Sequence, residues 1–157
     1  MDVIRYDKEL KRTHWDLLLE ADSWLEAVQK YVPPQNPQAE VFLIGRPHEP
    51  YALCVTVPIK DGLEIKNIAT RPMMRRQGMA SALIEYVIGL ARERGLAAVE
   101  IGTGTTGHEQ IRLYEKHGFK RDGILPGFFL QYPEPIIENG QLLKDMVMMR
   151  LELFPSN

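Results

Sequence analysis

The sequence predicts one mixed α/β domain over residues 1–157, in which a central, mostly antiparallel sheet is flanked by helices. The chain has the ordinary size of a single globular domain, and 45 % of its residues are hydrophobic, enough for one sizeable core. Short apolar runs bounded by turn residues alternate with segments of helical periodicity. The proline-rich stretches at 33–37 and 47–50 are interpreted as surface loops, because neither separates two segments that could fold alone.

The N-terminal part is predicted to contain a short strand and two helices. Val3-Ile4 forms the strand, and Asp7 is placed to cap a helix over residues 8–21. Ser23-Trp-Leu-Glu26 has the capping-box pattern, which opens a second helix ending near Tyr31.

Three apolar runs follow, at residues 41–44, 51–57 and 63–70, with turn residues between them. This spacing is typical of an antiparallel meander. In the third run the period of two slips at Lys66-Asn67, and two interpretations stay open. Either a β-bulge splays the strand and frees backbone N–H groups for a ligand, or a polar Asn67 faces inward with local hydrogen bonds.

The second half alternates helices and strands. Apolar residues recur at helical spacing from Arg75 to Arg94, and Thr106-Gly-His-Glu109 is a second capping-box pattern. The predicted elements are, in chain order, a helix over 75–94, a strand over 97–103, a helix from Thr106 to Gly118, an irregular stretch over 123–142 and a strand over 145–153.

Composition excludes several classes of protein. A formal net charge of -2 is too balanced to argue for nucleic acid, although it leaves room for a local basic patch. No stretch approaches the roughly 20 apolar residues that span a membrane. The first fifteen residues have no apolar run typical of a signal peptide. Cys54, the only cysteine, is expected to be a small buried hydrophobe in a cytoplasmic protein. The four histidines make no metal-ligand pair, so no metal is expected.

Two glycine-containing turns compete as the ligand site. Arg75-Arg-Gln-Gly-Met-Ala80 precedes the long helix, where unpaired N–H groups, the helix dipole and two arginines favour a pyrophosphate. Gly102-Thr-Gly-Thr-Thr-Gly107 is a literal G-x-G-x-x-G between a strand and a helix, which is typical of dinucleotide or S-adenosylmethionine sites. We favour the first turn, because residues 119–121 are too short and polar for a central parallel strand and too little chain remains for a doubly wound domain.

The first turn and its flanks resemble the GNAT (Gcn5-related N-acetyltransferase) superfamily. Arg75-x-x-Gly78-x-Ala80 matches the signature of that superfamily, and Leu113-Tyr-Glu-Lys-His-Gly-Phe119 matches its L-Y-x-x-x-G-F element. Further similarity at 100–106 and 134–140 points to a bacterial branch mostly described only as acetyltransferases. The resemblance implies acetyl-CoA as co-substrate and direct transfer of the acetyl group to a primary amine.

The resemblance also implies roles for individual residues. Backbone groups of Ile68, Ala69 and Thr70 pair with the pantetheine arm, and Tyr114 protonates the departing CoA thiolate. Thr105 offers a hydroxyl to the same arm, in a loop where the branch commonly has Asn and Ser. The residues implied to hold the pyrophosphate are Arg75, Arg76, Gln77, Gly78, Met79, Ala80 and Ser81.

For the base that deprotonates the amine the resemblance implies Glu64, which lies four residues before Ile68, where the histone-acetylating branch of the superfamily has a catalytic glutamate; Glu100 is second choice. The acceptor is a small-molecule or peptide amine, for which Glu134, Glu138 and Asp145 are candidates for an acidic rim. Residues 123–142 are expected to shape its pocket, through Phe128 and Tyr132 among others. Pairing of two copies as a homodimer, an acyl-CoA-binding regulatory role, and a dinucleotide or S-adenosylmethionine enzyme remain alternatives.

Overall fold

The structure, a computed structural model, describes residues 1–154 and confirms the mixed α/β class. One seven-stranded sheet has the order β1-β2-β3-β4-β5-β9-β6, and a two-stranded sheet pairs β7 with β8. In the large sheet only β4 and β5 run parallel. The strands are β1 (Val3–Tyr6), β2 (Glu40–Arg46), β3 (Glu49–Ile59), β4 (Gly62–Thr70), β5 (Ala98–Gly104), β6 (Lys120–Leu125), β7 (Ile137–Glu138), β8 (Gln141–Leu142) and β9 (Met146–Glu152).

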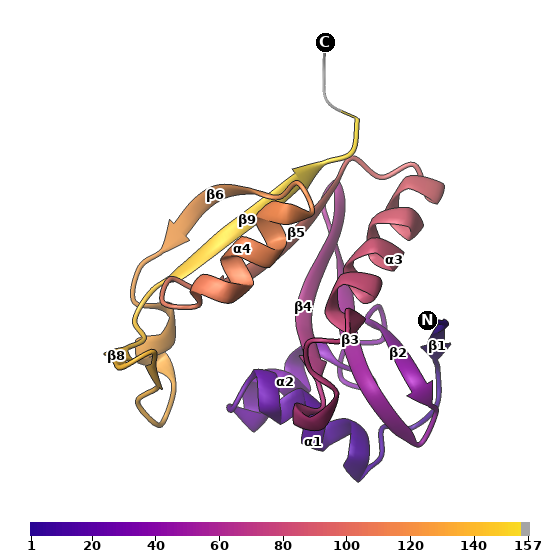
Figure 1. The fold of residues 1–157 in the computed structure, drawn as a ribbon, viewed down its shortest axis with the longest axis horizontal. Helices are drawn as coiled ribbons and strands as arrows, with labels where there is room; N and C mark the ends of the chain where they lie inside the picture. Colours follow the sequence, from indigo (N-terminus) through magenta and orange to yellow (C-terminus); the bar gives the residue numbers. More distant parts are fainter. Residues whose placement is uncertain (155–157) are drawn as a thin grey trace.

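Helices cover both faces of the sheet (Figure 1). They are α1 (Arg12–Ala21), α2 (Leu25–Tyr31), α3 (Met79–Glu93) and α4 (His108–Lys116), with short 3-10 turns η1 (Pro72–Met74) and η2 (Phe128–Gln131). In β3, Ala52 and Cys54 pack with α3, whereas Leu53 and Val55 pack with α1 and α2. Burial on both faces explains why this strand is a nearly continuous apolar run. Burial raises the pKa of the Cys54 thiol to about 12, and the expectation of a buried cysteine is confirmed.

The meander β2–β3–β4 is confirmed. The slip in the period of β4 combines the two interpretations, since the strand has a bulge and Asn67 faces inward. Val55 pairs with Asn67 and Thr56 with Ile65, so Lys66 is the extra residue of a bulge. Asn67 is also buried, but its hydrogen bonds are long-range rather than local. Its amide nitrogen donates to the Leu18 carbonyl at 3.0 Å and to the Tyr31 hydroxyl at 2.9 Å. The bulge therefore turns Asn67 towards α1 and α2.

Strands β4 and β5 separate halfway along β4. Their parallel pairing starts at Gly62 and Ala98, so close that a side chain at Gly62 would clash with the Ala98 carbonyl. It ends at Ile65 and Ile101. Beyond that point β4 stays with β3 and β5 stays with β9, which opens the wedge visible in Figure 1. The edge of β4 that faces the wedge has no neighbouring strand in the described part of the chain.

The predicted starts of α1 and α2 are wrong. Helix α1 begins at Arg12 rather than near Lys8, because His14 replaces Asp7 as its cap: the His14 Nδ1 accepts the Lys11 N–H at 2.9 Å. Helix α2 begins at Leu25 with no side-chain cap from Ser23.

The predicted starts of α3 and α4 also differ from the structure. Helix α3 begins at Met79 because Gly78 adopts a left-handed conformation that ends the preceding turn. Helix α4 begins at His108, and Thr106 does not cap it. The Thr106 hydroxyl instead donates to the Glu138 carboxylate at 2.8 Å, across 32 residues of sequence.

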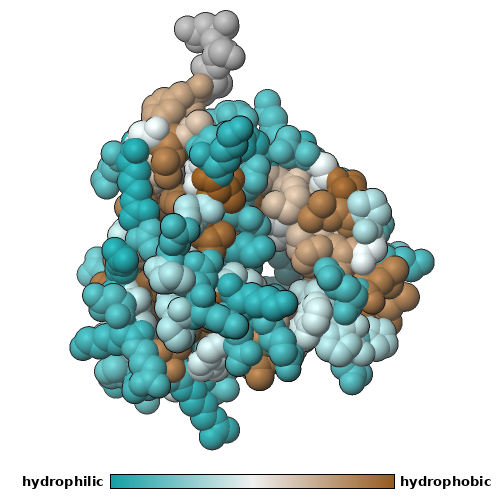
Figure 2. Space-filling view, turned by 180° about the vertical axis from the view of Figure 1, so that it is seen from behind, coloured by the Kyte–Doolittle hydropathy of each residue, from teal (hydrophilic) through white to brown (hydrophobic). Residues whose placement is uncertain are grey.

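The stretch at 123–142 is less irregular than predicted, since it contains the end of β6 together with η2, β7 and β8. Strand β6 lies at the edge of the sheet and all its residues are exposed. Hydrophobic atoms gather on the side of the molecule that carries β6 and β8 (Figure 2). In residues 1–154 no helix is long and apolar enough to cross a membrane.

Candidate active site

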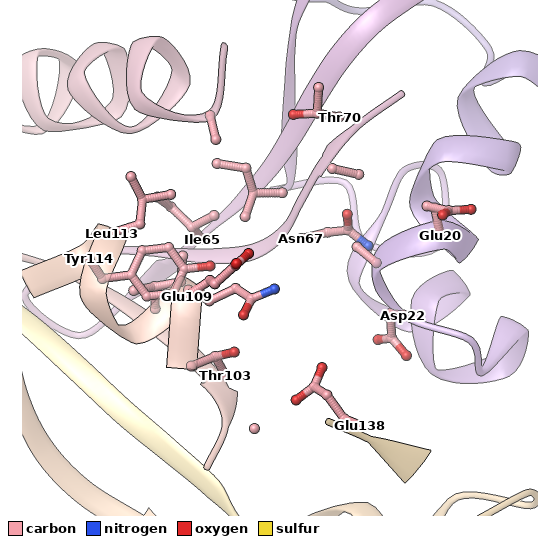
Figure 3. Close-up of a pocket in the computed structure, with 18 of the residues that line it drawn as sticks. Glu20, Asp22, Ile65, Asn67, Thr70, Thr103, Glu109, Leu113, Tyr114 and Glu138 are labelled. Atoms are coloured by element: carbon pink, nitrogen blue, oxygen red, sulfur yellow. The ribbon is translucent and has the colours of Figure 1, made fainter. Parts of the chain in front are cut away.

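A cleft of about 890 Å³ lies where β4 and β5 separate. One side is formed by the end of β4, the turn before α3, the start of α4 and the end of β5 (Figure 3). The other side is formed by the corner between α1 and α2 and by parts of the 129–146 segment. The wedge in the sheet is thus the floor of a pocket that brings together residues distant in the sequence.

The unpaired edge of β4 supplies backbone groups to this cleft. Ile68, Ala69 and Thr70 all line it, as the resemblance implies. A strand edge without a neighbour leaves N–H and C=O groups free for an extended ligand, which can bind there as an added strand would. The bulge at Lys66 lies just before these residues and marks the point where the wedge opens.

The turn before α3 has the backbone features that favour an anion. Gly78 has φ +80° and Arg76 has φ +64°, and α3 starts with neither a side-chain cap nor an acidic residue in its first turn. The first N–H groups of the helix are therefore left for a ligand, at the positive end of its dipole. Space beside Gly78 is open, since an added Cβ would approach only the tip of Met1, at 3.7 Å. Met79, Ala80 and Ser81 line the cleft, whereas Gln77 does not.

Tyr114 belongs both to the hydrophobic core and to the wall of the cleft. It is 4 % exposed and packs near Phe119, yet it lines the opening between the strands. Burial raises the pKa of Tyr114 above its usual range, so the phenol keeps its proton. It can therefore act as a proton donor to a group in the cleft.

Carboxylates gather at the other side of the cleft. Glu20, Asp22 and Glu138 line it, and Figure 3 shows Asp22 and Glu138 pointing into the space between α1 and β7. Asp22 accepts hydrogen bonds from the Tyr31 hydroxyl at 3.0 Å and the Tyr132 hydroxyl at 2.9 Å. Within the described residues neither Asp22 nor Glu138 has a Lys or Arg partner, while Glu20 pairs with Arg75 at 3.0 Å. This side of the cleft is electronegative.

Both predicted bases lie outside the cleft. Alternation along β4 places Glu64 on the sheet face opposite Ile65, and its carboxylate lies 3.6 Å from the Lys66 ammonium. Burial, opposed by Lys66 and assisted by Glu100, raises the pKa of Glu64. Glu100 is paired with Arg150 at 3.0 Å. Of these side chains only Lys66 reaches the lining of the cleft.

Several other residues predicted for the site do not line the cleft. Thr105 does not line the cleft, and its N–H donates to the Asp145 carbonyl at 3.0 Å, while Thr103 takes the place expected for it. Phe128 lies outside the lining, although its neighbour Phe129 and Tyr132 belong to it. Glu134 and Asp145 are likewise outside, so Glu138 alone remains of the predicted rim. Thr103 lies inside the G-x-G-x-x-G stretch, which was set aside as a nucleotide site, whereas Asp22 belongs to no motif and no sequence signal would have singled it out.

The glycines at 102–107 have a structural explanation. The strand that follows α4 is β6, and β9 lies between β5 and β6, so these two strands do not form the adjacent parallel pair of a dinucleotide-binding unit. A Cβ at Gly102 would lie 2.7 Å from the Met146 sulfur and 2.8 Å from the Met148 sulfur. A Cβ at Gly104 would lie 2.5 Å from a methyl of Leu143. Side chains thus pack closely over both glycines, which also line the cleft.

A splayed sheet, an uncapped helix start and a protonated tyrosine at one cleft form the architecture of an acyltransferase. The comparison with protein families agrees: the model described as the Acetyltransferase (GNAT) family matches residues 11–119. The chain therefore belongs to the GNAT acetyltransferase family, and the resemblance noted from its motifs is confirmed.

Relatives cover nearly the whole chain. The uncharacterized N-acetyltransferase YvbK of Bacillus subtilis is 34 % identical over 154 residues, which are 96 % of each chain. A GNAT family acetyltransferase from Elizabethkingia anophelis, solved with acetyl-CoA bound, has a TM-score of 0.87 at 32 % identity, covering 97 % of each chain. A Bacillus subtilis acetyltransferase in complex with CoA has a TM-score of 0.86 at 31 % identity, covering 97 % of this chain and 98 % of that one.

Proposed function

We propose that this protein transfers the acetyl group of acetyl-CoA directly to a primary amine of a small molecule or a peptide. The observation that carries the proposal is the single cleft that joins the uncapped start of α3, the free edge of β4 and the protonated Tyr114. The acetyl-CoA and CoA bound to two similar structures support the choice of donor.

The donor would lie along the β4 side of the cleft. Its pyrophosphate meets the N–H groups at the start of α3, with Arg75 and Arg76 adding positive charge. Its pantetheine arm pairs with the edge formed by Ile68, Ala69 and Thr70. The thioester then lies near Tyr114, with a backbone N–H of the splayed strand to stabilise the oxyanion, a contribution often of about 3 kcal/mol.

Transfer then requires two proton movements. The neutral amine attacks the thioester carbonyl carbon, the new C–N bond forms, and the C–S bond breaks with its electron pair leaving on sulfur. The Tyr114 hydroxyl gives its proton to the thiolate, and a base removes the extra proton from the amine nitrogen. Glu64, the predicted base, is half-buried, and so is Asp22, which lines the cleft and is the carboxylate to compare it with.

The electronegative side of the cleft favours a cationic acceptor. Amines are mostly protonated at neutral pH, so an ammonium is drawn to Glu20, Asp22 and Glu138 before it loses a proton. Burial and the Asp22 carboxylate raise the pKa of Tyr132, so its hydroxyl stays a donor and holds Asp22 in place. We therefore keep the 123–142 stretch in the proposed acceptor pocket, which Phe129, Tyr132 and Glu138 support because they line the cleft.

We keep Glu64 as the proposed base, acting through water because Lys66 stands between it and the cleft. Replacing Glu64 by glutamine is then expected to lower kcat by about 10²-fold. The base works when ionised, so the kcat of the parent should rise as the pH rises through the raised pKa of Glu64. In the Glu64→Gln variant this rise of kcat with pH should be absent. Asp22→Asn is the comparison, expected to raise KM for the amine by about tenfold at nearly unchanged kcat. The opposite division of effects in steady-state kinetics would move the base to Asp22.

Tyr132 is expected to affect the acceptor and not the donor. Tyr132→Phe removes the hydroxyl that donates to Asp22 and keeps the ring, so KM for the amine should rise several-fold and the ranking of amines should change. The calorimetric affinity for acetyl-CoA should stay within twofold. Leu130→Ala, in the same segment but exposed and outside the lining, is the control and should change neither. Parallel loss of acetyl-CoA affinity in Tyr132→Phe would place this residue in the donor site.

The proposed function is tested by a transfer screen over amines, with free CoA release and acetylated product measured together. Thermal shifts with acetyl-CoA, NAD and S-adenosylmethionine complete the test. We expect that only acetyl-CoA, of the three ligands, stabilises the protein, and that the screen yields an acetylated amine. Stabilisation by acetyl-CoA without turnover of any amine would indicate a regulatory acyl-CoA-binding protein, and stabilisation by one of the other two ligands would overturn the donor.

A further inference from the structure

A histidine links the end of α4 to the first turn of α3. His117 is the C-cap residue of α4, and its Nε2 lies 3.0 Å from the Ser81 hydroxyl oxygen. Its side chain is only 11 % exposed, and its Nδ1 lies 3.9 Å from the carboxylate of Glu85, one turn further along α3. Ser81 lines the cleft, whereas His117 lies behind it and does not.

A serine hydroxyl carries one proton, so its direction decides what Ser81 offers to a ligand. If the proton points back to His117, the cleft meets only lone pairs, which repel an anion. If His117 donates from Nε2 to the Ser81 oxygen, the serine proton is free to point into the cleft. The hydrogen bond from His117 to Ser81 and the hydrogen bond from Ser81 to a ligand in the cleft then run in the same direction and strengthen each other.

We propose that His117 is a positioning residue for the donor: it donates to Ser81 and directs the Ser81 hydroxyl at the pyrophosphate of CoA. This inference rests on the proposed function, which places the pyrophosphate at the start of α3. It also gives a physical link between the two sequence motifs, because Ser81 follows directly on Arg75-x-x-Gly78-x-Ala80 and His117 lies inside Leu113-Tyr-Glu-Lys-His-Gly-Phe119.

The test compares two acyl donors. Acetyl-CoA carries the pyrophosphate, whereas S-acetylpantetheine lacks it and keeps the thioester. His117→Phe removes the donor and should weaken CoA binding, measured by calorimetry, about tenfold. It should raise KM for acetyl-CoA by a similar factor and leave kcat within twofold. With S-acetylpantetheine as the acyl donor, the variant and the parent should have the same KM and kcat.

Three further measurements separate positioning from a general effect on folding. His117→Gln, whose amide can donate in place of Nε2, should restore CoA affinity to within twofold of the parent. Ser81→Ala should lose about as much affinity as His117→Phe, and the double variant should lose no more than either alone. The melting temperature of each variant monitors the fold.

Several outcomes would overturn the inference: equal losses with both donors, additive losses in the double variant, or a His117→Gln variant as weak as His117→Phe. Unchanged CoA affinity in His117→Phe would do the same while leaving the proposed function intact. A parent protein that binds no CoA would remove the proposed function itself, and the role of His117 with it.

Discussion

Replacing Tyr114 by phenylalanine is expected to lower kcat by about 10²-fold or more with little change in acetyl-CoA affinity. The substitution removes only the hydroxyl, and the ring keeps its place beside Phe119 in the core. A CoA-like thiol has a pKa of about 8.5, so protonation of the thiolate helps at neutral pH without being indispensable. Because burial raises the pKa of Tyr114, the phenol is protonated across the neutral range and ready to donate.

The loss should shrink with an acyl donor whose thiol is more acidic, since that leaving group needs less help. Tyr86→Phe is a matched control: it removes a phenol hydroxyl from a partly buried tyrosine that packs on Phe42, away from the cleft. Rapid-mixing kinetics must first show that chemistry limits the rate. A Tyr114→Phe enzyme with the kcat of the parent under those conditions would leave Tyr114 a core residue only.

The second large effect is expected at Gly78. Gly78→Val should weaken acetyl-CoA binding roughly 100-fold or more, because a branched side chain would occupy the space that the pyrophosphate needs and would keep it from several N–H groups. At φ +80° a valine is strained, so the variant should also be less stable.

Gly95, just after the other end of α3, separates strain from binding. It has φ +71° and no neighbour within 4 Å of an added Cβ, so Gly95→Val should suffer a similar backbone strain far from the cleft. Calorimetry with acetyl-CoA and thermal unfolding are compared for both variants. We expect both to melt earlier and only Gly78→Val to lose the ligand. Equal acetyl-CoA affinity in the two variants would show that the pyrophosphate binds elsewhere.

Strands were more predictable than helix ends. The runs at 41–44, 51–57 and 63–70 lie within β2, β3 and β4, because strands covered on both faces need apolar residues nearly throughout. Asp7, Ser23 and Thr106 were each expected to cap a helix, and none does. A hydroxyl or carboxylate bonds to whichever partner the folded chain brings closest. For Thr106 that partner is Glu138, on a segment that sequence patterns did not place.

The residues predicted for the site also fall into two groups, those that line the cleft and those that do not. Ile68 to Thr70, Tyr114 and most of the turn before α3 line the cleft as the motifs implied, although their roles stay predictions. Glu64 was placed from its distance in sequence to Ile68, and Thr105 from its position in a loop of the resembled branch; both lie outside the lining. A shift of one residue along a strand moves a side chain to the other face, so sequence distance places Glu64 poorly.

By itself the sequence determined the family, the three strands of the meander, and the turn before α3 as part of the cleft, because each is marked by a pattern of neighbouring residues. Only the tertiary structure decided which carboxylates line the cleft: Glu20, Asp22, Glu109 and the predicted Glu138 do, whereas Glu64, Glu134 and Asp145 do not. The physical reason is that a carboxylate on an exposed segment has no local pattern to distinguish it. Asp22 acquires its place from the hydroxyl of Tyr132, 110 residues away, and only packing across the wedge between β4 and β5 brings the two together.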